Sequence, residues 1–221
     1  YFENYSLPEY HGELLYPCGA KWHTSLVNPD FSFTVAVNWK QLADQSEEVR
    51  NMLGNDFNLY TSRVTPVHTV GGNMYTHSYP NFKRIVYEGF DSYEKRIEKI
   101  SDSEIRNGLF DLMVGIRCFH SRILQKLKDE GAEDSELYKA LTKVPFSPAE
   151  TLYEALVCWN FVYYLDGCDD IGRMDADLIP FYKGEDMTEV FRCFFRNVDA
   201  NSGWSGTLGP DYNPLTVQCL K

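Results

Sequence analysis

Thr151-Leu-Tyr-Glu-Ala-Leu156 and, after an aromatic run, Gly172-Arg-Met-Asp-Ala-Asp-Leu-Ile-Pro-Phe-Tyr182 are the two stretches that decide the fold. Pro148 is well placed to begin a long helix over residues 149–164, because proline fits a first helical turn, where its missing N–H is not needed. The first stretch therefore lies near the start of a helix, and the second follows the end of that helix.

The second stretch contains an arginine two residues ahead of an aspartate. A buried pair of this kind makes a bidentate ion pair that fixes local geometry. Pro180 and the adjacent aromatic residues would stiffen the chain as it leaves that pair. We expect a mainly structural role for Arg173 and Asp175, with lining of a cavity as the alternative.

Together the two stretches resemble a two-part signature of the glycyl radical enzymes, the pyruvate formate-lyase-like family. In that signature an E-A-L helix precedes a G-R-x-D-x-x-L-x-P-F/Y-Y segment, and Glu154, Gly172, Arg173 and Asp175 occupy the matching positions. Residues 176–177 are Ala-Asp, where the family commonly has Gln-Tyr. The resemblance implies a predominantly helical α/β fold, part of a ten-stranded α/β barrel with surrounding helices.

Two further segments resemble the same family. Leu208-Gly-Pro-Asp-Tyr-Asn-Pro-Leu-Thr216 is similar to a G-x-D…N-x-L-T/S stretch, in which Asn213 and Thr216 would cap a helix. Residues 70–91 are similar to a loop in which a histidine precedes a helix with a central glycine. With both segments, the resemblance covers about residues 70–221, and residues 1–221 are expected to form one incomplete domain, the amino-terminal portion of such an enzyme.

The loop before this helix supplies the candidate substrate-binding residues. His77 lies four residues ahead of Asn81, and the helix that follows contains Gly89. In the family this loop faces the substrate cavity, so the resemblance implies that His77, Tyr75 and Asn73 bind substrate. The alternative is that His77 caps the helix or forms a hydrogen bond within the loop.

The resemblance implies radical chemistry whose central residues have no counterpart in this sequence. In the family, a glycine in an R-V-x-G-Y/F loop stores an unpaired electron and passes it to a cysteine, whose thiyl radical removes a hydrogen atom from the substrate. Arg63-Val64 is followed by Thr-Pro-Val, and Cys219 lies in the wrong context for the thiyl position. The catalytic residues are therefore unknown from this sequence.

The resemblance also implies an activity and a set of partners. The activity would be a radical lyase reaction on a small polar organic substrate, by carbon–carbon cleavage, dehydration or decarboxylation under anaerobic conditions. No cofactor would bind this part directly, because a radical S-adenosylmethionine activating enzyme installs the radical elsewhere. The remaining partners would be the rest of the barrel or a homodimer partner.

Composition excludes several other classes. A formal net charge of -11 without a basic cluster argues against binding to nucleic acid or to anionic membranes. The sequence shows no apolar run long enough to span a membrane and no leader peptide, so we expect a soluble, cytoplasmic protein. The six cysteines form no C-x-x-C motif, and together with the histidines they show no metal-binding spacing. No metal site is therefore predicted from these residues.

Hydrophobic periodicity predicts a mainly helical chain from residue 82 onwards. Helices are expected over residues 82–93, from the Ser101-x-x-Glu104 capping box to near Gly131, briefly after Ser135, and over 186–195. The strand candidates are Phe31-Ser-Phe-Thr-Val-Ala-Val37 and residues 204–208.

Two other functions are left open by the residues. The acidic run over residues 166–177 could hold Mg²⁺ and a diphosphate, as in all-helical isoprenoid enzymes, although its spacing differs from D-D-x-x-D. A non-catalytic subunit or binding domain on the same scaffold is the other alternative. Both ends of the sequence look cut, which favours a piece of a larger enzyme.

Overall fold

The computed structural model describes residues 7–17, 80–166, 170–200 and 206–221. Within these ranges the elements are helices, and no strand forms beyond a single bridging residue, Asp170. The predominance of helix is confirmed for this part of the chain. The barrel strands are not seen there: residues 31–37 lie outside the described ranges, and residues 206–208, in the second strand candidate, are irregular.

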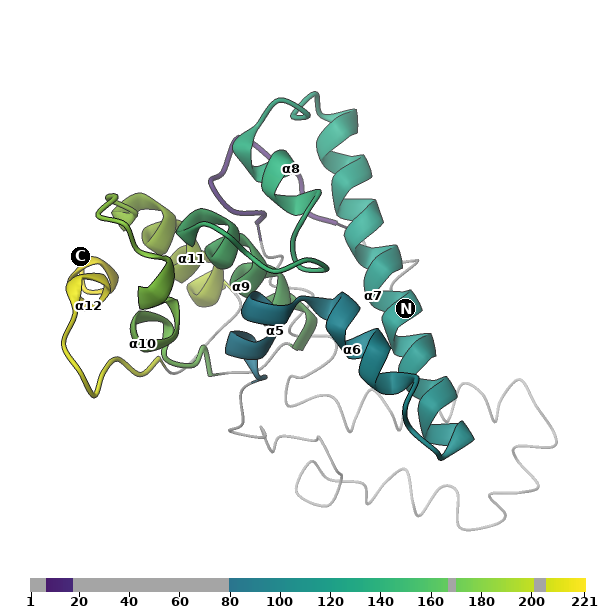
Figure 1. Cartoon of the computed structure of the whole chain (residues 1–221). Helices are drawn as coiled ribbons and strands as arrows, with labels where there is room; N and C mark the ends of the chain where they lie inside the picture. The colour runs from purple at the N-terminus through teal and green to yellow at the C-terminus, as the bar shows by residue number, and fades with distance from the viewer. Residues whose placement is uncertain (1–6, 18–79, 167–169, 201–205) are drawn as a thin grey trace, which may run out of the picture.

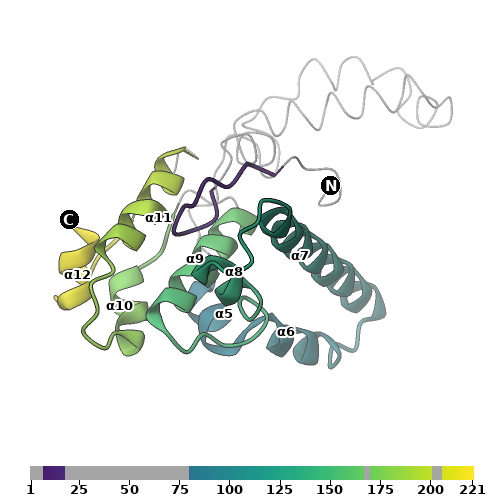
Figure 2. The ribbon, with the colours of Figure 1, turned by 90° about the horizontal axis from the view of Figure 1, so that it is seen from above.

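The helices fall into two groups on either side of α9 (Figures 1 and 2). One group contains α5 (Phe82–Glu88), α6 (Phe90–Ile97), α7 (Ser103–Asp129) and α8 (Glu136–Leu141). The other contains α10 (Met174–Leu178), the 3-10 turn η3 (Ile179–Phe181), α11 (Thr188–Ala200) and α12 (Pro214–Cys219). Helix α9 (Leu152–Asp166) packs against α5, α8 and α11, and so joins the two groups.

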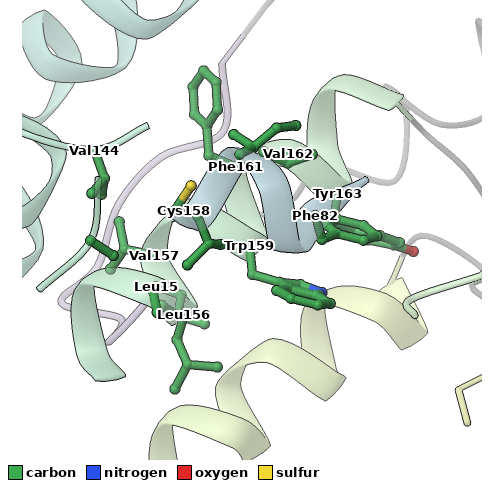
Figure 3. Packing of buried hydrophobic residues seen from close by; sticks show 14 of the residues in the cluster. Leu15, Phe82, Val144, Leu156, Val157, Cys158, Trp159, Phe161, Val162 and Tyr163 are labelled. Carbon is green, nitrogen blue, oxygen red and sulfur yellow. The ribbon is translucent and has the colours of Figure 1, made fainter. Parts of the chain in front are cut away.

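Helix α9 can lie in the middle because it is apolar on every side. A helix with an apolar surface all round is stable only when it is enclosed, since each exposed face would cost free energy. Trp159 and Tyr163 are fully buried, and the Phe82 ring stacks on the Trp159 ring with centroids 4.4 Å apart. Figure 3 shows these side chains gathered with apolar neighbours from α9 and with Leu15 of the N-terminal segment.

The N-terminal segment 7–17 has no regular structure and is held by side chains from the helices. The Tyr153 hydroxyl donates to Leu14 O at 2.8 Å. The amide groups of Asn160 and Asn197 both donate to Tyr16 O at 3.1 Å, and Asn197 also donates to Asn160 Oδ1 at 2.9 Å. The two buried amides therefore share the Tyr16 carbonyl as their acceptor. The segment therefore bridges α9 and α11.

The long helix expected over residues 82–93 is in fact two helices. Gly89 adopts φ 71°, and the chain turns there so that Phe90 N donates to Pro145 O at 2.9 Å and Asp91 N to Phe146 O at 3.2 Å. A β-carbon at residue 89 would overlap the Phe146 carbonyl oxygen. The break therefore exists because the backbone of α6 docks on the 145–147 loop, which lies far along the sequence.

Two predicted helix starts were also wrong by a few residues. Helix α7 is capped by Asp102, whose Oδ1 accepts from Glu104 N and Ile105 N, so Ser101 is not the cap. Helix α9 begins at Leu152 instead of Ala149. By contrast, Ser135 caps α8 as predicted, with its hydroxyl accepting from Tyr138 N at 3.1 Å.

Candidate functional site

A hollow of about 460 Å³ lies where the start of α5 meets α10. It is lined by Pro80, Asn81, Phe82, Lys83, Arg173 and Asp177. Two of the segments singled out in the sequence, 70–91 and 172–182, therefore meet at one depression. We take this hollow as the candidate functional site.

The α5 side of the hollow is set by a cap and a buried ring. Asn81 Oδ1 accepts from Arg84 N at 3.1 Å, which satisfies one of the free N–H groups of the first turn. Phe82 is completely buried against Trp159, so it anchors the helix to α9. Lys83, the next residue, is left exposed at the edge of the hollow.

The α10 side carries one paired and one unpaired charge. Asp177 lies 3.4 Å from Lys83 Nζ, and its backbone carbonyl accepts from the Tyr87 hydroxyl at 3.0 Å. Arg173, at the N-cap of α10, is exposed, and within the described part of the chain it has no hydrogen bond or ion pair. The ion pair Lys83–Asp177 joins two residues that lie far apart in the sequence, so it has no local sequence signal.

The predicted ion pair between Arg173 and Asp175 was wrong. Asp175 is fully buried, and it turns away from the hollow towards the 209–216 segment. Its carboxylate accepts from Gly209 N at 3.0 Å and from the Thr216 hydroxyl at 2.7 Å. With these donors the carboxylate is satisfied without an arginine, and Arg173 is free to line the hollow. Arg173 lines the hollow, and whether that hollow is part of a substrate cavity stays a prediction.

Two of the segments that carry the family resemblance, 172–182 and 208–216, therefore meet at one carboxylate. Asn213 Nδ2 donates to Asp175 O at 3.2 Å, and Asn213 Oδ1 caps α12 by accepting from Leu215 N at 2.8 Å. Thr216 completes a capping box with Asn213, as the sequence predicted for these two cap residues. Gly172, with φ 70°, forms the turn that leads into α10. This cluster is a structural clamp between α10 and α12.

Glu154 of the first stretch is also structural. Its Oε2 accepts from Glu150 N at 2.7 Å and from Thr151 N at 3.3 Å, while Glu154 N donates to Thr151 Oγ1 at 3.1 Å. This reciprocal pair is a capping box at the start of α9. Lys143 Nζ donates to the same carboxylate oxygen at 2.9 Å, which ties the end of the α8 region to α9.

Burial and hydrogen bonding act in opposite directions on the Glu154 carboxyl. Burial raises its pKa, but the backbone N–H of Glu150, the Lys143 ammonium and the backbone N–H of Thr151 together hold the pKa below its ordinary value. The ionised form is therefore the one that the fold stabilises.

The predicted substrate-binding residues Asn73, Tyr75 and His77 lie outside the described residues, so their roles stay predictions. The hollow begins at Pro80, immediately after that loop. Lys83 and Asp177 were not singled out as site residues from the sequence. A charged residue at the start of a helix is usually solvated, so it gives no sequence signal of a site. Lys83 and Asp177 meet only because α10 lies beside α5.

The acidic run does not converge on a metal site in the described part of the chain. Asp170 accepts from Gly172 N at 2.9 Å, Asp175 faces Thr216, and Asp177 pairs with Lys83. Across the ranges that the structure describes, no cluster of three potential ligands from His, Cys, Asp and Glu occurs.

Burial raises the pKa of the Cys158 thiol. Burial, followed by the nearby Asp175, raises the pKa of the Cys219 thiol to about 12. Both thiols are therefore protonated and packed.

Known proteins resemble this chain in structure more than in sequence. No protein-family model matches it, and no curated protein does. Its fold is similar to that of a solved structure concerned with 1,2-propanediol dehydration in Roseburia inulinivorans and with the basis of substrate and enantiomer selectivity. The TM-score is 0.64 at 14% identity. The likeness is one of fold alone.

The chain spans 39% of the length of that solved structure, while the match covers 99% of this chain. The likeness agrees, at the level of fold, with the expectation of a glycyl radical enzyme portion drawn from the sequence. Barrel strands are not seen among the residues that the structure describes. In the described ranges, moreover, no helix combines the length and the apolar character needed to cross a membrane.

Proposed function

We propose that this chain is the amino-terminal portion of a glycyl radical enzyme, a radical lyase that acts on a small polar organic substrate. The observation that carries the proposal is the fold likeness over 99% of the chain to a structure concerned with 1,2-propanediol dehydration. The resemblance of separate segments to the family signature also supports the proposal. Two of these segments, which are distant in the sequence, come together in the clamp around Asp175.

In this proposal the chain supplies one wall of the substrate cavity and the framework that holds it. Hydrogen-atom abstraction needs the substrate C–H bond close to the thiyl sulfur, so the cavity walls must be rigid. Phe82 stacked on Trp159 and the clamp at Asp175 fix the two helices that border the hollow. Asn81, Lys83 and Arg173 would then contact the substrate, together with the loop that contains His77.

The radical steps themselves require residues that match no motif in this sequence. A thiyl radical would take a hydrogen atom from substrate carbon to form S–H and a carbon radical. In a dehydration, that radical would lose water before the hydrogen atom returns to carbon. Here the chain's own residues bind and orient the substrate and exclude water from the carbon radical.

The test uses the full-length gene product. It should contain a downstream R-V-x-G-Y/F loop, and anaerobic incubation with an activating enzyme and S-adenosylmethionine should produce a glycyl doublet in electron paramagnetic resonance. The 221-residue polypeptide treated in the same way is the matched negative control, and no doublet is expected from it. A full-length product that lacks the loop and gives no doublet would show that the proposal is wrong.

The reaction type follows from product analysis of the activated protein. Incubation with 1,2-propanediol and with small hydroxylated carboxylates should consume one class and leave the other unchanged. An activated enzyme that removes water gives an aldehyde or keto product without carbon–carbon cleavage. Loss of carbon dioxide or of a shorter fragment would assign decarboxylation or cleavage instead.

A further inference from the structure

The hollow between α5 and α10 carries an excess of positive charge. Lys83 and Asp177 are 3.4 Å apart, and they largely offset each other. Asp175, the other carboxylate of α10, is buried and bonded to Gly209 and Thr216. Among the described residues, no carboxylate pairs with the guanidinium of Arg173 at the edge of the hollow.

This situation differs from that of most other arginines in the described part of the chain. Arg84, Arg96, Arg117 and Arg192 each pair with a carboxylate. The protein has a net charge of -11 and so has carboxylates in excess, yet no carboxylate in the described ranges pairs with Arg173. The remote acidic charges are weakened at the hollow because salt screens them beyond about 10 Å at 0.1 M.

The donors around the hollow suit a planar oxyanion. A guanidinium offers parallel N–H groups that match the two oxygens of a carboxylate. The Asn81 side-chain carbonyl is used as the α5 cap, so its amide N–H groups remain as donors on the same rim. The volume of about 460 Å³ admits a small organic molecule. A neutral diol would leave the Arg173 charge without a partner.

We propose that the α5–α10 hollow binds the carboxylate of a small organic molecule, with Arg173 as the main anion-binding residue and Asn81 and Lys83 as further donors. The proposal of a carboxylate-binding site is supported by the positions of Arg173, Asn81 and Lys83 around the hollow. The statement that the bound carboxylate belongs to the substrate rests on the proposed function. The enzyme would then act on a small hydroxylated carboxylate, in contrast to the neutral 1,2-propanediol of the structurally similar protein.

Lactate and 1,2-propanediol form a matched pair of probes, because they differ in a carboxylate against a hydroxymethyl group. In an ¹⁵N NMR titration at constant ionic strength, lactate should shift the Arg173 side-chain signal and the backbone amides of residues 81–83 saturably. The diol should not. Inorganic phosphate serves as a second anion, and binding of phosphate without binding of lactate would overturn the assignment to a carboxylate.

Arg173→Gln should weaken lactate binding about tenfold or more, since a charge-assisted hydrogen-bond pair is lost. Arg173→Lys should retain part of the affinity because the charge remains. Arg196→Gln is the matched control: Arg196 is also exposed but lies on α11, away from the hollow, and its loss should leave binding unchanged. Arg173 is exposed, so its substitution should not change the unfolding midpoint.

Equal affinity of Arg173→Gln and unsubstituted protein for lactate would overturn the proposal, as would an equal loss in Arg196→Gln. This outcome is separate from the radical test. Lactate binding with no glycyl doublet in the full-length product would retain the carboxylate site and reject the radical lyase. A glycyl doublet without lactate binding would support the radical lyase and reject the carboxylate site.

Discussion

At the residue scale, Asp175 shows how one buried carboxylate connects distant segments. It is fully buried, and its donors come from Gly209 and Thr216 as well as from its neighbour Ala176. A buried charge is tolerated only when hydrogen bonds replace its lost hydration. The aspartate of the G-R-x-D segment therefore holds α10 to α12, and the neighbouring arginine is left to face the hollow.

Asp175→Ala should lower the free energy of unfolding by about 3 kcal/mol, because it removes the acceptor of the partly buried Gly209 N–H and of the buried Thr216 hydroxyl. Asp175→Asn keeps one carbonyl oxygen and should cost less. Urea denaturation followed by circular dichroism measures both. Asp199→Ala, on the exposed end of α11, is the control and should change stability by under about 0.5 kcal/mol. Equal effects at both positions would contradict the clamp.

Glu154 allows a prediction for pH dependence. The folded state lowers the pKa of this carboxyl, so its stabilising contribution is present above the unfolded pKa and is lost as pH falls through the folded pKa. The stability difference between unsubstituted protein and Glu154→Gln should therefore be largest near pH 7, about 1 kcal/mol for the lost charge on these hydrogen bonds, because glutamine still caps the helix. It should shrink steadily as the solution is acidified below about pH 4.5.

Urea midpoints recorded between neutral and acidic pH for both proteins test this prediction. Glu133→Gln is a suitable control because Glu133 is exposed and pairs with Lys128 on the surface. A stability difference for Glu154→Gln that is constant with pH would show that the effect arises from side-chain shape instead of charge.

At the scale of elements, the junction between α5 and α6 depends on a single glycine. The conformation of Gly89, at φ 71°, is strained for any side chain, and a β-carbon there would meet the Phe146 carbonyl. The same glycine lets α6 leave the line of α5 and bond to the 145–147 loop. Local sequence favours a continuous helix at this place, and a tertiary contact overrides it.

Gly89→Ala should destabilise the protein by about 3 kcal/mol, from the strained backbone and the overlap together. Gly108→Ala is the matched control: this glycine lies inside α7, is exposed, and has open space around its position. Alanine there should stabilise by about 0.5–1 kcal/mol because it favours the helix. Thermal unfolding of the two variants should therefore move the midpoint in opposite directions, and equal shifts would contradict the close approach at residue 89.

At the scale of the whole molecule, α7 leaves part of its apolar face uncovered. In the C-terminal half of α7, Ile116, Phe119, Ile123 and Leu127 are buried. The same stripe continues towards the N-terminus at Ile105 and Leu112, whose side chains are 56% and 49% exposed. Exposed apolar side chains on one face of a helix favour association.

Replacing Ile105 and Leu112 together with serine should reduce concentration-dependent self-association of the 221-residue polypeptide, as measured by sedimentation velocity. The substitutions should change monomer stability by under about 0.5 kcal/mol each, because both side chains are largely solvated. Tyr212→Ser, at a separate exposed apolar residue, is the control and should leave association unchanged. A protein that is monomeric at all concentrations would contradict the prediction.

Local signals in the sequence were sufficient for much of the helical structure. The periodic stripe of α7, the cap at Ser135 and the capping box of Asn213 with Thr216 all act within a few residues, so they can be recognised without a fold. The resemblance of three segments to one enzyme family also needed only short patterns. The likeness of fold to a structure concerned with 1,2-propanediol dehydration supports that reading coarsely.

The features that packing alone decided all join residues distant in the chain. Lys83 meets Asp177, Phe90 N bonds to Pro145 O, and Asp175 takes its donors from the 209–216 segment. In each case the two bonded groups are far apart in the sequence. A charge or an N–H group can also be satisfied by water or by a neighbouring residue, so the sequence alone does not identify its partner. Only the tertiary structure therefore identifies Gly209 and Thr216 as the donors to Asp175 and places Arg173 at the hollow.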